Sequence, residues 1–142
     1  MIQSVRIAKL NDKATLPERK HADDAGLDLF ASESAAIAPL QMAVIGTGIA
    51  IEIPKGFVGL IFLKSRSNFL LGGGVVDAGY QGEIRVKISN VRDQLLEIEE
   101  GQAIAQLLLV PIETPAVQEV SIEDLFEKVS KRGSQGGIHL PV

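Results

Sequence analysis

The sequence predicts an all-β protein, a sandwich or barrel with at most one short helix. Two observations predict it: several segments alternate apolar and polar residues with a period of two, and glycines and prolines recur at short intervals between them. The 142 residues are enough for one domain with a core of its own. We therefore expect a single β-rich domain over residues 1–130 and a glycine-rich C-terminal arm over residues 131–142.

The strand predictions rest on two kinds of pattern. The segments that carry either pattern lie at 5–10, 47–53, 56–64, 83–89 and 103–112. The segment 83–89 is apolar at every second residue and is the clearest case of alternation. The segments 56–64 and 103–112 are more continuously apolar, which is typical of strands that are buried on both faces.

One segment, 121–129, has helical spacing instead. The apolar residues that recur as they would along one face of a helix are Ile122, Leu125, Phe126 and Val129. Ser121 stands where an N-cap is expected. Because the segment is short, it predicts a helical turn or two and no more.

Composition and charge exclude several classes of function. The chain has no cysteine, which excludes disulfides and thiolate metal sites, and its two histidines, His21 and His139, are too far apart in sequence to predict a zinc site. No apolar run approaches the ~20 residues that span a bilayer. The first ten residues lack the pattern of a signal peptide, so we expect a cytoplasmic protein without a membrane partner. A net charge of −4 argues against a nucleic-acid partner but allows a small anionic ligand.

Asp77 is a lone carboxylate among apolar residues in the segment 74–86. Asp-Ala-Gly is a sequence that favours turns, so one interpretation is that Asp77 begins a turn. The other interpretation is that Asp77 is a general base beside a substrate. Tyr80, the only tyrosine of the chain, could stack on a ring-shaped ligand or be a strand-edge aromatic.

Polar residues follow the apolar segment 56–64, and two of them suit a phosphate. Arg66 could bind phosphate through two parallel hydrogen bonds, and Ser67 could donate to a bridging oxygen; a solvated loop is the alternative. Asp28 lies between two leucines, where it could serve Mg²⁺ or face outward from a strand. Gln106 could donate its amide to a phosphate or be a satisfied core amide, and Arg132 could fold over an anion or belong to a basic tail.

Five stretches, taken in chain order, resemble the five motifs of the trimeric dUTP pyrophosphatases (dUTPases). They read DAGLDLFA, KSRSN, GVVDAGYQGEI, EEGQAIAQLLLVPI and KRGSQGG, and the resemblance extends from about residue 22 to residue 137. The resemblance implies a jelly-roll homotrimer whose active sites lie at subunit interfaces. It also implies Mg²⁺-dependent hydrolysis of dUTP to dUMP and pyrophosphate.

The resemblance implies a role for each matching residue. Asp77 is the implied general base that deprotonates the attacking water, and Tyr80 is the implied ring that packs on the deoxyribose. Asp28 is the implied metal residue, linked to Mg²⁺ through water or to the arginine of the last motif. The other implied positions bind the substrate, by reading the uracil edge through a main-chain hairpin or by contacting the phosphate chain: Gly74, Ile84, Arg66, Ser67, Asn68, Gln106 and Arg132.

Two departures accompany the resemblance. Residues 68–74 form a shorter connection than the family usually has. The fifth motif continues as GGIHLPV, so Gly137, Ile138 and His139 stand where the family has a phenylalanine followed by glycine, serine and threonine. This chain has neither the aromatic residue nor the serine-threonine pair. We therefore expect a weaker KM or a slower turnover than is typical of the family.

Two other functions remain as alternatives. A dCTP deaminase-like enzyme would share the fold, but it needs a glutamate on the strand after the third motif, and IRVKISN has no acid at its inward positions. A non-catalytic member that binds nucleotides or proteins is the second alternative. It has no need of Asp77, Tyr80, Arg66 and Gln106, all of which this chain retains.

Overall fold

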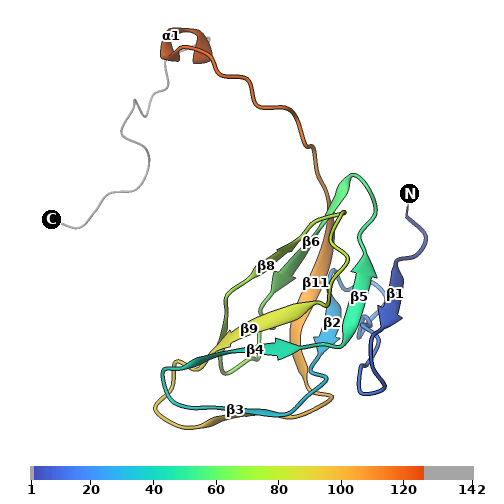
Figure 1. Ribbon diagram of the computed structural model, residues 1–142, viewed down its shortest axis with the longest axis vertical. Coiled ribbons are helices and arrows are strands. Elements are labelled where there is room, and N and C mark those ends of the chain that lie inside the picture. Colours follow the sequence, from blue (N-terminus) through green and yellow to red (C-terminus); the bar gives the residue numbers. More distant parts are fainter. Residues whose placement is uncertain (1, 127–142) are drawn as a thin grey trace, which may run out of the picture.

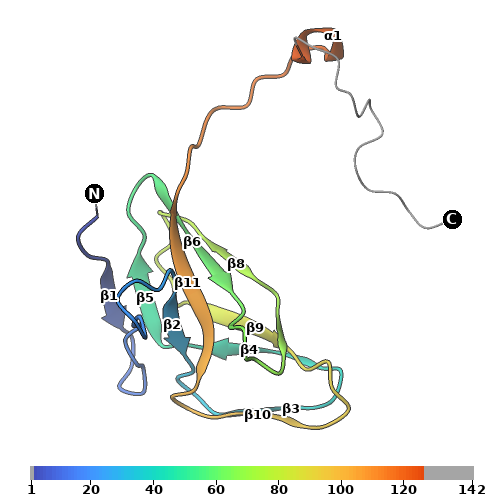
Figure 2. The same ribbon diagram turned by 180° about the vertical axis from the view of Figure 1, so that it is seen from behind.

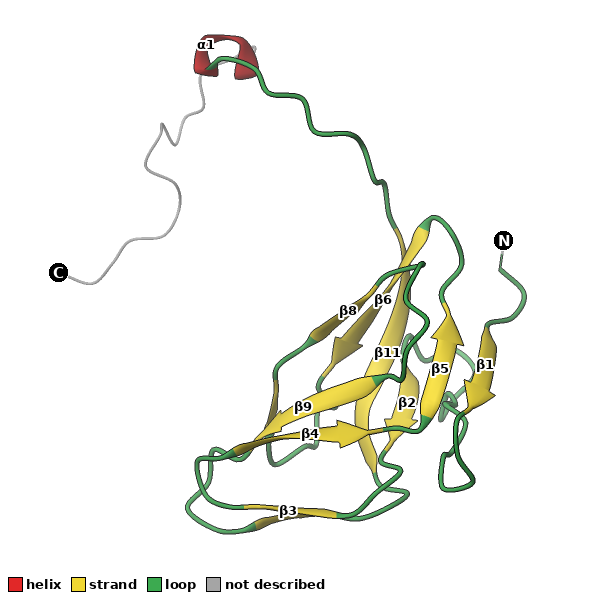
Figure 3. Cartoon of the chain, in the orientation of Figure 1, coloured by secondary structure: helices red, strands yellow, loops and turns green. Residues whose placement is uncertain are grey.

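The computed structural model describes residues 2–126, which are built almost entirely of short strands (Figures 1 and 3). The strands are β1 (Arg6–Lys9), β2 (Leu27–Phe30), β3 (Ala35–Ile37), β4 (Met42–Gly46), β5 (Ile49–Glu52), β6 (Phe57–Phe62), β7 (Leu70–Leu71), β8 (Gly74–Val76), β9 (Arg85–Ser89), β10 (Leu96–Ile98) and β11 (Ala103–Pro111). One helical turn, α1 (Ile122–Leu125), follows them. The prediction of an all-β fold with at most one short helix is confirmed for this part of the chain.

The strands form four small antiparallel sheets around one interior (Figures 1 and 2). The largest has the order β2-β11-β6-β8, a second has the order β4-β9-β7, and the pairs β1-β5 and β10-β3 complete the body. Neighbouring strands within each sheet are mostly distant in sequence, as in the jelly-roll architecture that the motifs imply.

The core is aliphatic and draws on the inward faces of these sheets. Leu29, Ile49 and Leu107, from three different strands, are each fully buried. In β9 the buried Val86 and Ile88 alternate with exposed basic residues, which confirms the alternation predicted for 83–89. Burial of one face of each strand is what holds these short sheets together.

The second face of the largest sheet is not buried in the single chain. Leu107 and Ile61 pair across β11 and β6 and face the core. On the opposite side, Leu108 is only partly buried, Phe62 is 49% exposed and Val75 is 68% exposed. We call this apolar surface the outer face; it consists of Leu60, Phe62, Val75, Leu108 and Val110. The prediction of burial on both faces is wrong for the isolated chain.

Two local predictions also differ from the structure. β8 pairs with β6, while β9 pairs with β4 and β7, so the two strands around Asp77 belong to different sheets and do not form a hairpin with each other. At α1 the hydroxyl of Ser121 makes no cap bond to the backbone and donates instead to Oδ2 of Asp124, at 2.9 Å. The turn ends at Leu125, and residues 127–129 of the predicted helix lie outside the described part of the chain.

Candidate active site

The first group of candidate residues lies along one row that crosses neighbouring strands of the largest sheet. Gln106, in the middle of β11, lies opposite Asp28 of β2 on one side and opposite Phe62 of β6 on the other. The Gln106 side chain donates from Nε2 to the carbonyl oxygen of Leu63, at 3.0 Å. Asp28 forms an ion pair with the ammonium group of Lys64, the second residue after β6. Strand register thus brings the first, second and fourth motifs together.

A tight turn presents the polar residues that follow β6. The amide of Ser67 donates to the carbonyl oxygen of Lys64 at 3.1 Å, which closes the turn. Arg66 and Asn68 are exposed, while Ser67 is partly buried. Phe69, which is 4% exposed, anchors the end of the segment in the core. An arginine and a serine at the tip of a rigid turn suit the oxygens of a phosphate group. We call five residues the phosphate-site residues: Asp28, Lys64, Arg66, Ser67 and Gln106.

The second group surrounds the connection from β8 to β9. The amide of Tyr80 donates to the carbonyl oxygen of Asp77 at 3.0 Å, so Asp77 does begin a turn. Its carboxylate is exposed in the single chain, without the apolar surroundings expected for a general base. Tyr80 is 46% exposed, and its hydroxyl donates to the carbonyl oxygen of Glu83 at 2.7 Å. The ring is therefore held in place while one side remains open to a ligand.

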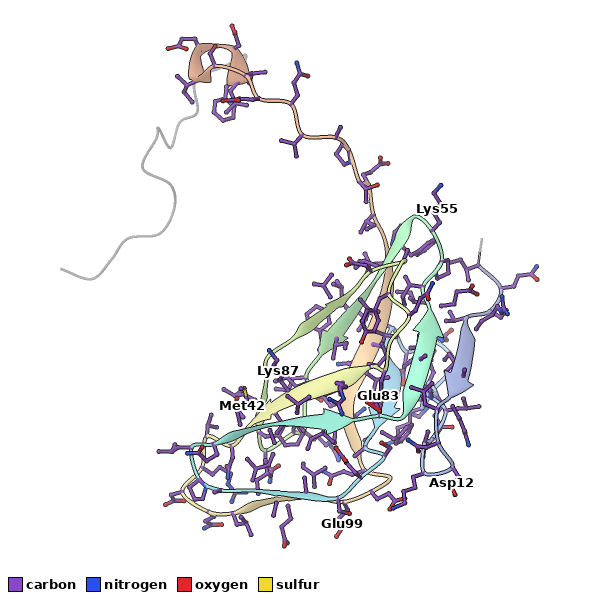
Figure 4. The ribbon with its side chains drawn as sticks, viewed as in Figure 1. Asp12, Met42, Lys55, Glu83, Lys87 and Glu99 are labelled. Atoms are coloured by element: carbon purple, nitrogen blue, oxygen red, sulfur yellow. The ribbon has the colours of Figure 1, made fainter. Side chains whose placement is uncertain are left out.

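Glu83 fixes this connection to the rest of the body, and sequence reasoning missed it. Its Oε1 accepts from the amide of Gly48 at 3.3 Å, and its Oε2 accepts from Nε of Arg85 at 2.8 Å. Figure 4 shows the labelled Glu83 beside the strands of the β4-β9-β7 sheet. The sequence carried one signal, an acid directly before an alternating strand, but not the position of the amide that it accepts from.

The main chain of Ile84 differs from its expected role in reading a base edge. Its amide donates to the carbonyl oxygen of Ile49 at 2.9 Å. Its carbonyl oxygen accepts from both the amide and the hydroxyl of Thr47, at 3.2 and 2.5 Å. Both main-chain groups of Ile84 are therefore occupied within the chain. Gly74, the other expected contact, pairs with Ile61 in the β8–β6 ladder.

The two groups of residues lie apart in one chain. Gln106 is opposite Phe62, whereas Val76, the residue before Asp77, is opposite Gly59. Three residues of β6 separate these rows, about 10 Å along the strand, and two strand spacings, again about 10 Å, separate β11 from β8. The connection after Val76 continues toward the start of β6, away from the turn that holds Arg66 (Figure 1). Side chains of ordinary length cannot bridge this separation.

A cleft of about 400 Å³ lies on the Tyr80 side. It is lined by Arg6, Ile7, Ala8, Ala50, Ile51, Glu52, Ala78, Tyr80 and Gln81. The lining includes none of the phosphate-site residues, which agrees with the separation of the two groups.

The structure bears on metal binding only through Asp28. Within residues 2–126, no three acidic or histidine side chains gather closely enough to hold a metal by themselves. Asp28 is the acidic member of the phosphate-site residues, and its side chain is 16% exposed. One carboxylate beside candidate phosphate contacts fits Mg²⁺, which commonly keeps several waters and takes its other ligands from a phosphate chain. Arg132 and the rest of the fifth motif lie outside the described residues.

The fold and the two groups define an all-β protein with residues for an anionic ligand that carries a ring. The dUTPase family model matches residues 12–137. A deoxyuridine 5'-triphosphate nucleotidohydrolase of Corynebacterium diphtheriae is 41% identical over 139 residues, and one of Corynebacterium jeikeium is 39% identical over 140. Each match covers 93% of this chain and 89% of the relative. The chain belongs to the dUTPase family.

Solved structures show the same likeness. The dUTPase of Staphylococcus bacteriophage 80alpha, solved with dUPNHPP, matches with a TM-score of 0.85 and 33% identity over 96% of this chain and 97% of that one. A mutant dUTPase from phage phi11 of S. aureus, described with a structural Mg(II) ion, matches with a TM-score of 0.78 and 31% identity over 85% of this chain and 99% of that one. Within the described residues, no helix is long and apolar enough to cross a membrane.

Proposed function

We propose that the chain hydrolyses dUTP to dUMP and pyrophosphate at composite sites formed between copies of itself in a homotrimer. Membership of the dUTPase family supports the reaction. The separation of Asp77 and Tyr80 from Arg66 and Gln106 within one chain supports the composite site, because these residues can meet on one substrate only if different copies supply them.

The outer face provides the surface on which copies would associate. Two of its apolar residues, Phe62 and Val75, are exposed in the single chain and the other three are only partly buried. Together they cover the sheet between the two groups of site residues. Contact between outer faces would bury this area and bring the Asp77 end of one copy toward the phosphate-site residues of the next copy. The number of copies, three, is the one that the five motifs imply.

Each half of the site has a defined task in the proposed reaction. Asp77 takes a proton from a water whose oxygen attacks the α-phosphorus, while the bond from that phosphorus to the bridging oxygen breaks. The electron pair of that bond leaves with pyrophosphate, where Ser67, Gln106 and Arg66 stabilise the added charge. Tyr80 packs on the sugar. Phosphoryl transfer depends mainly on such positioning and charge stabilisation.

We also propose that Mg²⁺ takes part, with Asp28 as the residue that would hold it through water. When bound, the ion would supply charge neutralisation along the triphosphate. The phi11 dUTPase is described with a structural Mg(II) ion, which supports the proposal for this chain only by similarity. A cytoplasmic location suits a substrate that is a free nucleotide.

A substrate panel tests the reaction. The purified protein is incubated with dUTP, dCTP, dTTP or UTP, with Mg²⁺ or with EDTA, and the products are separated by chromatography. We expect dUMP and pyrophosphate only from dUTP, and only when Mg²⁺ is present. A uracil nucleotide formed from dCTP would instead support the deaminase-like alternative, and binding without turnover would support the non-catalytic one.

Mixed oligomers test the composite site. We expect Asp77→Asn and Arg66→Ala each to inactivate the enzyme when present in every copy. When the two variants are unfolded and refolded together, random assortment leaves about a quarter of the composite sites with both an intact Asp77 and an intact Arg66. We expect activity to return to roughly that level. No recovery, with mixed oligomers shown to form, would place both residues in one copy and overturn the proposal.

A further inference from the structure

Lys64 forms the least exposed ion pair in the described part of the chain. The Asp28 side chain is 16% exposed and the Lys64 side chain 31%, whereas each of the three other ion pairs includes a side chain that is at least 62% exposed. A pair that is this shielded from water attracts more strongly than one in bulk solvent. Lys64 is therefore held at a fixed place on the sheet.

The Lys64 ion pair lies among the phosphate-site residues. Asp28 and Lys64 come from elements on either side of β11, so their ion pair spans the central strand at the level of Gln106. The Gln106 carboxamide donates to Leu63, the residue directly before Lys64. Lys64 also begins the turn that carries Arg66. Lys64 is thus adjacent in the chain to the carbonyl that holds Gln106 and to the turn that carries Arg66.

Among the side chains of this group, Lys64 also decides the sign of the net charge. Without it, the charge of Asp28 would cancel that of Arg66, and a carboxylate would face the phosphate oxygens. With it, two positive charges and one negative charge leave the group at +1. An anion with several phosphates gains from that difference far more than one with a single phosphate.

We propose that Lys64 is a further substrate-binding residue, which makes the site prefer a triphosphate chain to a monophosphate. The inference rests on the proposed function, because it assigns the phosphate chain to this group of residues. Arginine keeps the charge but carries it on a larger planar group, so Lys64→Arg should retain most of the preference, whereas Lys64→Gln should lose it.

Calorimetry on the full chain tests this role. We expect Lys64→Gln to weaken binding of a non-hydrolysable dUTP analogue about tenfold while binding of dUMP changes less than about twofold. The salt dependence of analogue binding should fall as well, since one cation fewer is engaged. Lys87→Gln is the matched control: Lys87 is an exposed lysine of β9 in the other large sheet (Figure 4), and its loss should change neither ligand.

Three results would overturn the inference. Equal weakening of both ligands, together with a lower melting temperature, would show that the ion pair only supports the sheet. Unchanged binding of the analogue, or equal losses in the Lys64→Gln and Lys87→Gln variants, would remove Lys64 from the site. Inorganic triphosphate separates this inference from the proposed function: if the wild-type chain fails to hydrolyse dUTP yet binds inorganic triphosphate in a Lys64-dependent way, the function fails and the inference stands.

Discussion

The position of the Gln106 side chain depends on the absence of a side chain at Gly26. A Cβ atom on Gly26 would lie 2.3 Å from Oε1 and 3.0 Å from Cβ of Gln106. The first atom belongs to a flexible carboxamide, but the second is fixed to β11 and cannot move far. Gly26 thus leaves the space in which the carboxamide reaches the carbonyl oxygen of Leu63.

We expect Gly26→Ala to lower kcat/KM for dUTP about tenfold by displacing this carboxamide, as loss of one charge-assisted contact would. A double-mutant cycle checks the cause. In a Gln106→Ala background the carboxamide is gone and only the 3.0 Å contact with Cβ remains, so adding Gly26→Ala should cost less than it costs in the wild-type protein. Additive losses would show that Gly26 acts independently of Gln106.

At this scale the sequence predicted which residue types a phosphate site needs but not which of them meet. The chemistry of Asp28, Arg66 and Gln106 marks them as candidates, and the structure brings them to one region. No local pattern marks Lys64, because its value depends on a partner 36 positions away in the chain. Such a pairing is set by strand register, which no local pattern records.

Among the elements, the connection from β8 to β9 is held by Glu83. Its carboxylate reaches Gly48 and Arg85, and its main-chain carbonyl accepts from Tyr80. Gly82 contributes as well, because a Cβ there would lie 2.6 Å from the tyrosine hydroxyl oxygen. The connection that carries Asp77 is therefore tied at its far end to a different sheet.

We expect Glu83→Ala to lower kcat for dUTP about tenfold, since the Asp77 turn would no longer be held at one position. Glu83→Gln keeps an acceptor for the Gly48 amide and should retain more activity. Arg85→Gln removes the ion pair alone and is the control. A purely structural role for Glu83 would appear as a lower melting temperature with kcat unchanged in the fraction that stays folded.

The elements also show what periodicity can and cannot predict. Alternation correctly predicted β9 and its buried face, because a period of two follows from strand geometry itself. It could not predict that β8 joins β6, since partner choice depends on the packing of the whole body. The apolar run in β11 predicted two buried faces, and one of them is buried only if another copy covers it.

For the whole molecule, the outer face is the feature that an assembly would need. We expect Val75→Asp to prevent association, because a charge would be placed without a partner in an apolar contact. Val75 is 68% exposed in the single chain, so the subunit itself should still fold. Sedimentation should show smaller particles at the same protein concentration, and dUTP hydrolysis should be lost with them.

Val44→Asp is the matched control for that change. Val44 is an exposed valine in β4, on the β4-β9-β7 sheet and not on the outer face, with 43% of its surface accessible. Association and activity should survive there. If Val44→Asp dissociates the protein and Val75→Asp does not, the contact between copies lies on the smaller sheet.

In the proposed assembly, the separation of Asp77 from Gln106 within a subunit would make catalysis depend on the abundance of the protein. Turnover per subunit would fall as the protein is diluted past its dissociation constant, although no residue changes and no inhibitor is present. A cell that makes little of this protein would then lose more catalysis than the loss of polypeptide alone accounts for.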